Sequence, residues 1–291
     1  MIFCLYTDYG ALNSKPVFEA FAKSLKDAGH TVIYNEPYRV GAHYSNYDVA
    51  VIWSVLWHGR MAKNQTVWEQ NRLNNRPIIV LEVGGIKRGL TWKVGLNGIN
   101  RDAYFSTGNH NNDRAKLLGL KLEPWKHNET GNILICTQHD KSEQWRDMPS
   151  MSNWVIDTVS QIRKKTKRHI IIRAHPRCPL PHIEYEFRNV SRQVPKKLTG
   201  TYDDFDYEFE NAWAVVNWSS NPAVQAVIKG IPVFVGPSSL AYDVGNKDLT
   251  TINNPIKPER QQWLNNYAHT EYTIDEIAQG IPLKQLTNQL I

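Results

Sequence analysis

Two adjacent serines, Ser219 and Ser220, stand where an apolar run ends and a helix-like segment begins. Pro222 suits the first turn of a helix, because the N–H that proline lacks would have no partner there. Asn221 is then the expected N-cap, which leaves both hydroxyls beside the positive end of the helix. Hydroxyls and unpaired backbone N–H groups at such a position can receive a phosphate. An ordinary strand–helix turn, in which the serines bond to backbone groups, would explain the same residues.

A histidine between two arginines ends another apolar run. His175 is stiffened by the proline that follows it and is flanked by Arg173 and Arg177. Imidazole and guanidinium groups are donors suited to phosphate oxygens. Gln138 and Ser238 follow two further apolar runs and complete the expected anion-binding set.

Three residues in the first part of the chain are candidates for a general base: Asp8, Glu82 and His58, in that order. Each has an ordinary explanation. Asp8 could cap the first helix, Glu82 could pair with Lys87 or Arg88, and His58 could pack within its loop. The chain contains neither GxxxxGK[ST] nor a GxGxxG after its first apolar run, which argues against ordinary dinucleotide use.

Strand and helix patterns alternate in the elements that must position these residues. Strands are expected over residues 1–7, 30–35, 48–56 and 76–85, and helices over 16–29 and 63–74. The pattern fades over 86–130 and restarts with strands at 132–138, 168–176, 212–218 and 231–236, and helices at 152–166 and 222–230. Two C-terminal helices are expected at 258–269 and 274–280, with Gly280 and Pro282 as stops.

This alternation predicts an α/β fold with two Rossmann-like domains, each with a parallel sheet, facing each other across a cleft. We expect residues 1–130 to form the acceptor-side domain and 131–291 the domain that binds the nucleotide-sugar. The last helices could pack back on the first domain. Ligands in such sheets bind beyond the carboxyl ends of the strands, where the candidate residues lie.

The composition and the N-terminal sequence indicate the cellular compartment. The three cysteines are far apart and lack metal-ligand spacing, so we expect no disulfide, no metal and a reducing compartment. The N-terminus has no signal-peptide pattern, and no apolar stretch is long enough to span a membrane. We therefore expect a cytoplasmic protein, in a bacterium or an infected host cell, of unknown oligomeric state.

Aromatic and basic residues outside the apolar runs are candidates for acceptor binding. The chain has 10 tryptophans, 13 tyrosines and a formal net charge of +6, a balance that favours anionic partners. Flat rings in polar surroundings could stack on sugars or bases, although packing at the rim of the core explains them as well. The expected acceptor contacts are Trp57, Trp92, Trp125, Arg114 and Lys126.

The segment from AHP to WSSNPAVQAVIKGIPVFVGP, over about residues 168–240, resembles the HP and SS motifs of GT-B glycosyltransferases. The resemblance is greatest to bacterial sialyltransferases and capsule-polysaccharide transferases, including 3-deoxy-manno-octulosonic acid transferases. It implies that His175, Ser219 and Ser220 contact the phosphate of a UDP- or CMP-linked sugar, with no other cofactor. Those sialyltransferases carry an acidic-acidic-glycine motif, of which residues 7–10 are a rough relative.

Glycosyl transfer needs stabilisation of charge on the leaving phosphate and a base for the acceptor hydroxyl. A helix N-terminus with hydroxyls and a His/Arg pair can supply the first without a metal ion. Size and aromatic content favour a hydroxymethylated pyrimidine in phage-type DNA as the acceptor. A capsule or cell-surface polysaccharide fits the resemblance equally well. A nucleotide-sugar epimerase or a non-catalytic binding protein remains the alternative in a different class.

Overall fold

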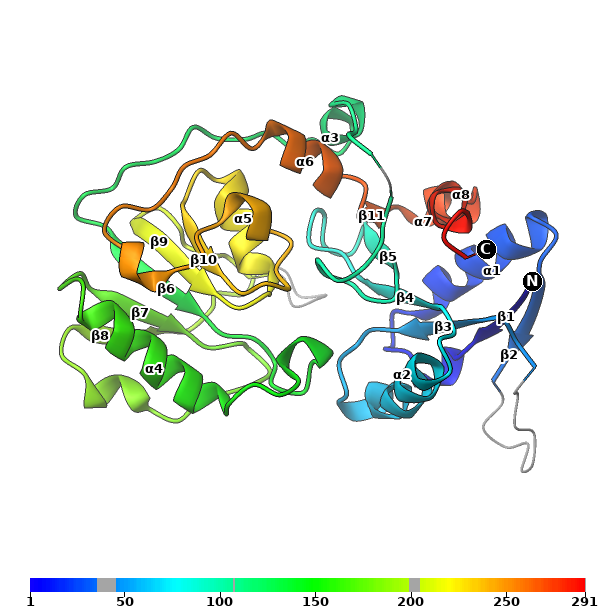
Figure 1. Cartoon of the computed structure of the whole chain (residues 1–291), viewed down its shortest axis with the longest axis horizontal. Helices are drawn as coiled ribbons and strands as arrows, with labels where there is room; N and C mark the ends of the chain where they lie inside the picture. The colour runs from blue at the N-terminus through cyan, green and yellow to red at the C-terminus, as the bar shows by residue number, and fades with distance from the viewer. Residues whose placement is uncertain (36–45, 107, 199–204, 291) are drawn as a thin grey trace. The chain divides into compact units, whose positions relative to one another are not determined.

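The computed structural model describes residues 1–35, 46–106, 108–198 and 205–290, and its chain divides into two compact units (Figure 1). Unit 1 comprises Met1–His110, Lys141–Glu143 and Asn266–Ile291, and unit 2 comprises Asn111–Asp140 and Gln144–Asn265. The C-terminal residues thus belong to the same unit as the N-terminus.

Unit 1 is built on a six-stranded sheet in the order β11-β5-β4-β3-β1-β2. Its strands are β1 (Ile2–Leu5), β2 (Thr31–Tyr34), β3 (Val49–Trp53), β4 (Ile78–Val83), β5 (Trp92–Leu96) and β11 (Glu271–Tyr272). The first four are parallel, as the near-continuous apolar runs predict. The last two run antiparallel and form one edge, which the sequence did not predict.

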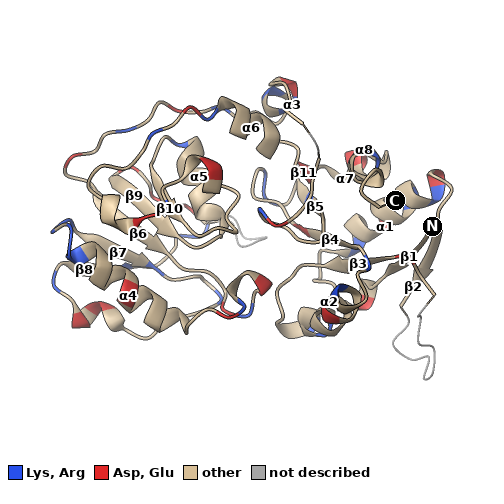
Figure 2. Ribbon diagram, in the orientation of Figure 1, with Lys and Arg blue, Asp and Glu red and all other residues tan. Residues whose placement is uncertain are grey.

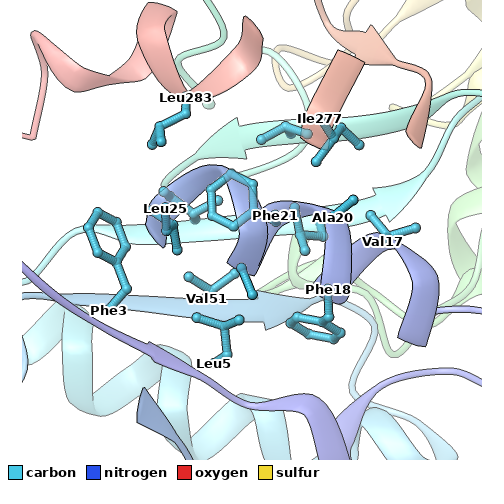
Figure 3. Close-up of a cluster of buried hydrophobic side chains, with 14 of the residues drawn as sticks. Phe3, Leu5, Val17, Phe18, Ala20, Phe21, Leu25, Val51, Ile277 and Leu283 are labelled. Carbon is cyan, nitrogen blue, oxygen red and sulfur yellow. The ribbon is translucent and has the colours of Figure 1, made fainter. Parts of the chain in front are cut away.

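Helices cover both faces of this sheet. They are α1 (Lys15–Asp27), α2 (Asn64–Leu73), α7 (Ile274–Ala278) and α8 (Ile281–Thr287). Figure 3 shows side chains of α1 lying between the sheet and the C-terminal residues Ile277 and Leu283. The opposite face packs on Val67 and Trp68 of α2.

The C-terminal segment follows its prediction at Gly280 and differs from it at Pro282. Helix α7 ends at Ala278, and Gly280 follows it with a left-handed φ of 75°, as expected of a stop, but Pro282 lies in the first turn of a further helix, α8. A proline in a first turn begins a helix at no hydrogen-bonding cost, so the residue expected to stop one helix opens the next.

Unit 2 is built on a five-stranded parallel sheet in the order β10-β9-β6-β7-β8. Its strands are β6 (Asn132–Cys136), β7 (Ile170–Arg173), β8 (Val190–Gln193), β9 (Ala212–Asn217) and β10 (Val233–Val235). Its helices are α3 (Asp113–Leu117), α4 (Met151–Arg163) and α5 (Asn221–Ile228), and α6 (Gln261–Tyr267) follows where the chain returns to unit 1. The apolar face of α4, with Val155, Val159 and Ile162, packs in the core of this sheet.

The division between the units falls after His110 and not near residue 130. The intervening segment is bound to unit 2 by its backbone. Glu123 N donates to Ile228 O at 2.9 Å, and Lys126 N donates to Gly230 O at 2.7 Å. The stretch without periodicity therefore has two parts: β5 belongs to unit 1, and the residues after His110 are packed on unit 2. Within the described ranges, no helix has the length and apolar character to cross a bilayer.

Candidate functional site

The residues at the carboxyl ends of four strands of unit 2 are paired in register across the sheet. Cys136 of β6 pairs with Asn217 of β9 and with Arg173 of β7, and Asn217 pairs with Val235 of β10. The loops that follow these residues carry the predicted anion-binding side chains. One sheet edge therefore gathers residues from four separate parts of the sequence, as the strand-end rule predicts.

Ser220 is the residue that begins α5 at this edge. It has the extended backbone of an N-cap (φ −78°, ψ 163°), while Asn221 is the first helical residue and donates its side-chain N–H to Tyr207 Oη at 3.0 Å. The predicted cap is therefore one residue too late. Ser220 Oγ accepts a 2.5 Å hydrogen bond from Asn217 Nδ2. A hydroxyl that accepts this bond keeps its own proton for a further acceptor, such as a phosphate oxygen.

Ser219 is held differently. Its backbone N–H and its hydroxyl both donate to Gln138 Oε1, at 3.1 and 3.0 Å. The serine is only 5% exposed, and its hydroxyl proton is directed at the glutamine. Ser219 and Gln138 therefore tie the loop after β9 to the loop after β6, and they position Ser220.

His175 presents a defined tautomer at the end of β7. Its backbone N–H donates to Thr137 Oγ1 at 2.9 Å, and its Nδ1 accepts from the Arg177 backbone N–H at 3.2 Å. Because Nδ1 is an acceptor, the proton of the neutral ring is on Nε2, which can donate to an anion. The loop backbone thus sets which ring nitrogen is the donor.

The two flanking arginines have different surroundings. Arg173 is 5% exposed, and its guanidinium donates to Gln193 Oε1 at 3.1 Å and to the Asp206 carbonyl at 2.5 Å. It also lies over the Tyr207 ring, 5.5 Å from the centroid. Arg173 therefore joins β7 to its neighbours and leaves the expected phosphate-binding set. Arg177 is exposed and stays in that set.

The loop after β10 brings Ser238 to the same edge. Gly236 N donates to Trp218 O at 2.8 Å, so the loops after β9 and β10 lie side by side. A Cβ on Gly236 would meet the Trp218 ring at 2.5 Å, and only glycine fits there. The Ser238 hydroxyl oxygen is enclosed and has no hydrogen-bond partner among the described residues. A cavity of about 220 Å³ adjoins Asn217, Trp218 and Gly236.

In unit 1, Glu82 lies in a cross-strand row of charged residues. Lys93 of β5 pairs directly with Glu82 of β4 on one side and with Glu271 of β11 on the other. Residues directly opposite in antiparallel strands share one face of the sheet, so the lysine lies between two carboxylates. Burial lowers the pKa of Lys93, and the charge of Glu271 opposes that shift.

Glu271 is itself a structural anchor. It is fully buried and accepts hydrogen bonds from Gly85 N at 2.7 Å, Ile86 N at 2.9 Å and Thr91 Oγ1 at 2.7 Å. These bonds fix the loop that follows Glu82. Glu82 is half-buried beside this anchored loop, and its Oε1 accepts from the Val83 N–H at 2.7 Å.

The other two candidate bases lie in more open surroundings. Asp8 is exposed in a short 3₁₀ helix at Thr7–Tyr9, and it does not cap α1. His58 is exposed and precedes a 3₁₀ helix at Gly59–Lys63. Of the three, Glu82 alone is both half-buried and paired across strands with a buried cation.

The aromatic residues expected to contact an acceptor are largely engaged inside the units. Trp92 is 4% exposed and packs against Trp53 at 5.9 Å between ring centroids, so it offers no face to a ligand and leaves the acceptor set. Trp57 is half-buried, and its Nε1 donates to Glu143 Oε2 at 3.1 Å. The same carboxylate accepts from Trp68 Nε1 through Oε1.

Trp125 and Lys126 lie in the segment beside the C-terminal end of α5. The Arg260 guanidinium covers the Trp125 ring at 3.7 Å, and Lys126 pairs with Glu123 at 3.0 Å. Their segment is bonded to the residues that end α5, whereas Ser220 begins that helix. Arg114 is in α3, which carries both signs of charge (Figure 2).

Three residues with clear roles at these sites were not predicted from the sequence. Asn217 orients Ser220, Thr137 orients His175, and Lys93 lies beside Glu82. Asn217 could have been predicted from the sequence, because an asparagine at the end of a buried apolar strand must find hydrogen-bond partners. Lys93 could not have been predicted, because β5 lies in the stretch without periodicity.

No model of a known protein family matches the chain. No curated protein sequence is detectably similar to it. Among solved structures, the chain is similar to the β-Kdo 2,7 transferase of Thermosulfurimonas dismutans KpsC. The TM-score is 0.54 and the identity 16%, over 98% of this chain and 100% of that one.

Two weaker similarities share this coverage. The β-Kdo 2,4 transferase of the same KpsC has a TM-score of 0.48 at 11% identity, over 97% of this chain and 98% of that one. UDP-GlcNAc 2-epimerase of Methanocaldococcus jannaschii has a TM-score of 0.37 at 10% identity, over 99% and 100%. The chain has an α/β, GT-B-like fold with two Rossmann-like units, each built on a largely or wholly parallel sheet.

Proposed function

We propose that this chain is a glycosyltransferase that takes a sugar from a nucleotide-sugar and passes it to a hydroxyl of a glycan. The observation that carries the proposal is the presence of two hydrogen-bond donors at the carboxyl ends of β7 and β9 in the sheet of unit 2. Ser220 is the N-cap of α5, and its hydroxyl can donate its proton to a ligand. The donor nitrogen of His175 is Nε2, because Nδ1 accepts a hydrogen bond.

These donors suit the leaving group of glycosyl transfer. When the bond between sugar and phosphate breaks, negative charge develops on the phosphate oxygens. Preorganised donors and the positive end of a helix stabilise that charge without reorganising during the reaction. We assign the donor phosphate to Ser220, His175 and the first turn of α5, with Arg177 as a further cationic contact and Ser219 and Gln138 as positioning residues.

The base for the acceptor hydroxyl is proposed to be Glu82. A carboxylate must be held in place to accept a proton in the transition state, and general-base catalysis of this kind contributes about 10²- to 10⁴-fold. The loop after Glu82 is fixed by Glu271, and Lys93 lies beside it on the same face. Asp8 and His58 are both exposed.

A glycan is favoured over DNA as the acceptor class. The DNA hypothesis depended on exposed aromatic side chains, but the Trp92 ring is buried and the Trp125 ring is covered by Arg260. The solved structure of similar fold bears the name of a Kdo transferase, in agreement with the resemblance of the HP and SS motifs to capsule-polysaccharide transferases. The donor sugar is proposed to be linked to CMP or UDP.

The proposal is tested by turnover of a panel of CMP-, UDP- and GDP-sugars with full-length protein. Each is incubated alone, with a set of capsule-type oligosaccharides, and with hydroxymethylated DNA, and nucleotide release and product mass are measured. We expect one sugar nucleotide to be consumed only with an oligosaccharide. Release that ignores every acceptor would indicate an epimerase or hydrolase, sugar on DNA would restore the nucleic-acid hypothesis, and no nucleotide release with any sugar nucleotide would remove the enzyme class.

A further inference from the structure

A mixed set of metal-ligating side chains lies between the loops that follow β6 and β7. His139 and Asp140 come from the first loop and Cys178 from the second, and one potential ligand atom from each lies within 4.8 Å of the others. The two loops leave paired residues on one rung of the sheet, Cys136 and Arg173. The fold therefore brings together residues that the sequence keeps far apart, which is why cysteine spacing gave no sign of them.

The second loop has a defined turn that aims the cysteine. Cys178 N donates to His175 O at 3.0 Å, and the two residues form an isolated bridge. The His175 ring lies 5.8 Å from the His139 ring, centroid to centroid. The cluster is therefore next to the histidine of the proposed donor site.

An ion pair explains only part of this cluster. His139 Nδ1 and Asp140 Oδ1 are 3.6 Å apart, and their side chains are 11% and 38% exposed. Imidazole, carboxylate and thiolate together form a set that holds a divalent ion.

We propose that His139, Asp140 and Cys178 bind a zinc-class divalent ion that holds the loops after β6 and β7 together. Bonds of 2.0–2.3 Å at tetrahedral angles place ligand atoms about 3.3 to 3.8 Å apart, so shifts of about 1 Å close the site. A thiolate and an imidazole select zinc or cobalt over magnesium or calcium, which prefer oxygen ligands. The fourth position is left to water, and the ion fixes the loop that carries His175.

The test uses full-length protein stripped of metal and titrated with Co²⁺ in the absence of any nucleotide. Cobalt bound to a thiolate gives an intense charge-transfer band, which reports ligation by cysteine directly. We expect the band to saturate at one ion per chain in the wild type and in Cys136→Ala, a control for a thiol buried within β6. Cys178→Ser should abolish the band, and Asp140→Asn should weaken cobalt binding at least about tenfold.

A thermal melt gives a second readout that does not depend on the thiolate band. An ion that binds only the folded state raises the melting temperature, so Zn²⁺ should stabilise the wild type and Cys136→Ala but not Cys178→Ser. The inference is overturned if the wild type shows no band and no thermal shift, or if Cys178→Ser keeps both. Because no nucleotide is present, this failure is separate from a failure of the donor-site proposal.

Discussion

Gln138 Oε1 accepts two hydrogen bonds from Ser219, one from its backbone N–H at 3.1 Å and one from its hydroxyl at 3.0 Å. The two adjacent serines therefore have different roles. The Ser219 hydroxyl donates to Gln138 in the loop after β6, whereas the Ser220 hydroxyl accepts from Asn217 and keeps its proton for a ligand. One of the serines positions the loop, and the other binds.

The first prediction follows from this division. Ser220→Ala should weaken binding of the donor nucleotide by about 10- to 100-fold, since it removes a hydrogen bond to a charged group. Ser152→Ala, in the first turn of α4, should leave the dissociation constant unchanged. Calorimetric titration with CMP and UDP measures both variants. Equal affinities for wild type and Ser220→Ala would remove Ser220 from the site.

Gln138→Leu is predicted to act on stability. The substitution leaves the Ser219 backbone N–H without its acceptor in a nearly closed environment, which costs about 1–3 kcal/mol. Urea unfolding should show this loss. The matched variant Gln161→Leu, at an exposed position of α4, should change the free energy of unfolding by less than about 0.5 kcal/mol. A Gln138→Leu protein as stable as the wild type would show that Ser219 has another way to satisfy its N–H.

Lys93 should give unit 1 a characteristic dependence on pH. Burial holds the pKa of Lys93 below its usual value of 10.5, so between the two pKa values the unfolded state binds more protons than the folded state. The free energy of unfolding then rises with pH across that window. The lysine is destabilising when charged, and this cost is relieved as the pH approaches 10.5.

The measurement compares the free energy of unfolding of wild type and Lys93→Met as the pH is raised. The free energy of unfolding of the wild type should rise relative to that of Lys93→Met as the pH increases. Lys15→Met, at a lysine whose side chain is 83% exposed, should keep a constant difference from the wild type. If the free energy of unfolding of the wild type instead falls relative to that of Lys93→Met as the pH rises, the charge of Glu271 outweighs the effect of burial, and the lysine is stabilised as a cation.

Glu82→Gln separates catalysis from binding. The amide keeps the size of the side chain but cannot accept the acceptor proton, so turnover should fall by about 10²- to 10⁴-fold. Nucleotide affinity, which depends on unit 2, should not change. Asp8→Asn and His58→Gln serve as controls and should retain turnover within a few-fold. If Asp8→Asn is the inactive variant instead, the base is Asp8 and not Glu82.

The sequence predicted the parts of the fold that follow local rules. Apolar runs such as residues 132–136 and 212–217 became parallel strands, and the amphipathic pattern of 16–29 became α1. Their order along the chain also placed His175 and Ser220 at strand ends, where the sheet brings them to one edge.

The remaining features depend on tertiary contacts. β5 is held by antiparallel pairing with β4 and with β11, which lies far away in the chain, so no local pattern marks it. Arg173 resembled a phosphate ligand because the sequence does not show that Gln193 and Asp206 surround it. Trp92 resembled a surface ring for the same reason, because its neighbour Trp53 comes from another strand.

We propose that unit 2 receives the donor phosphate at the start of α5, and a crystal structure of the chain with CMP or UDP bound would locate that phosphate. We expect phosphate oxygens within hydrogen-bonding distance of Ser220 Oγ and His175 Nε2, with Ser219 still bonded to Gln138. A phosphate bound elsewhere, with Ser220 and His175 both out of reach, would contradict it.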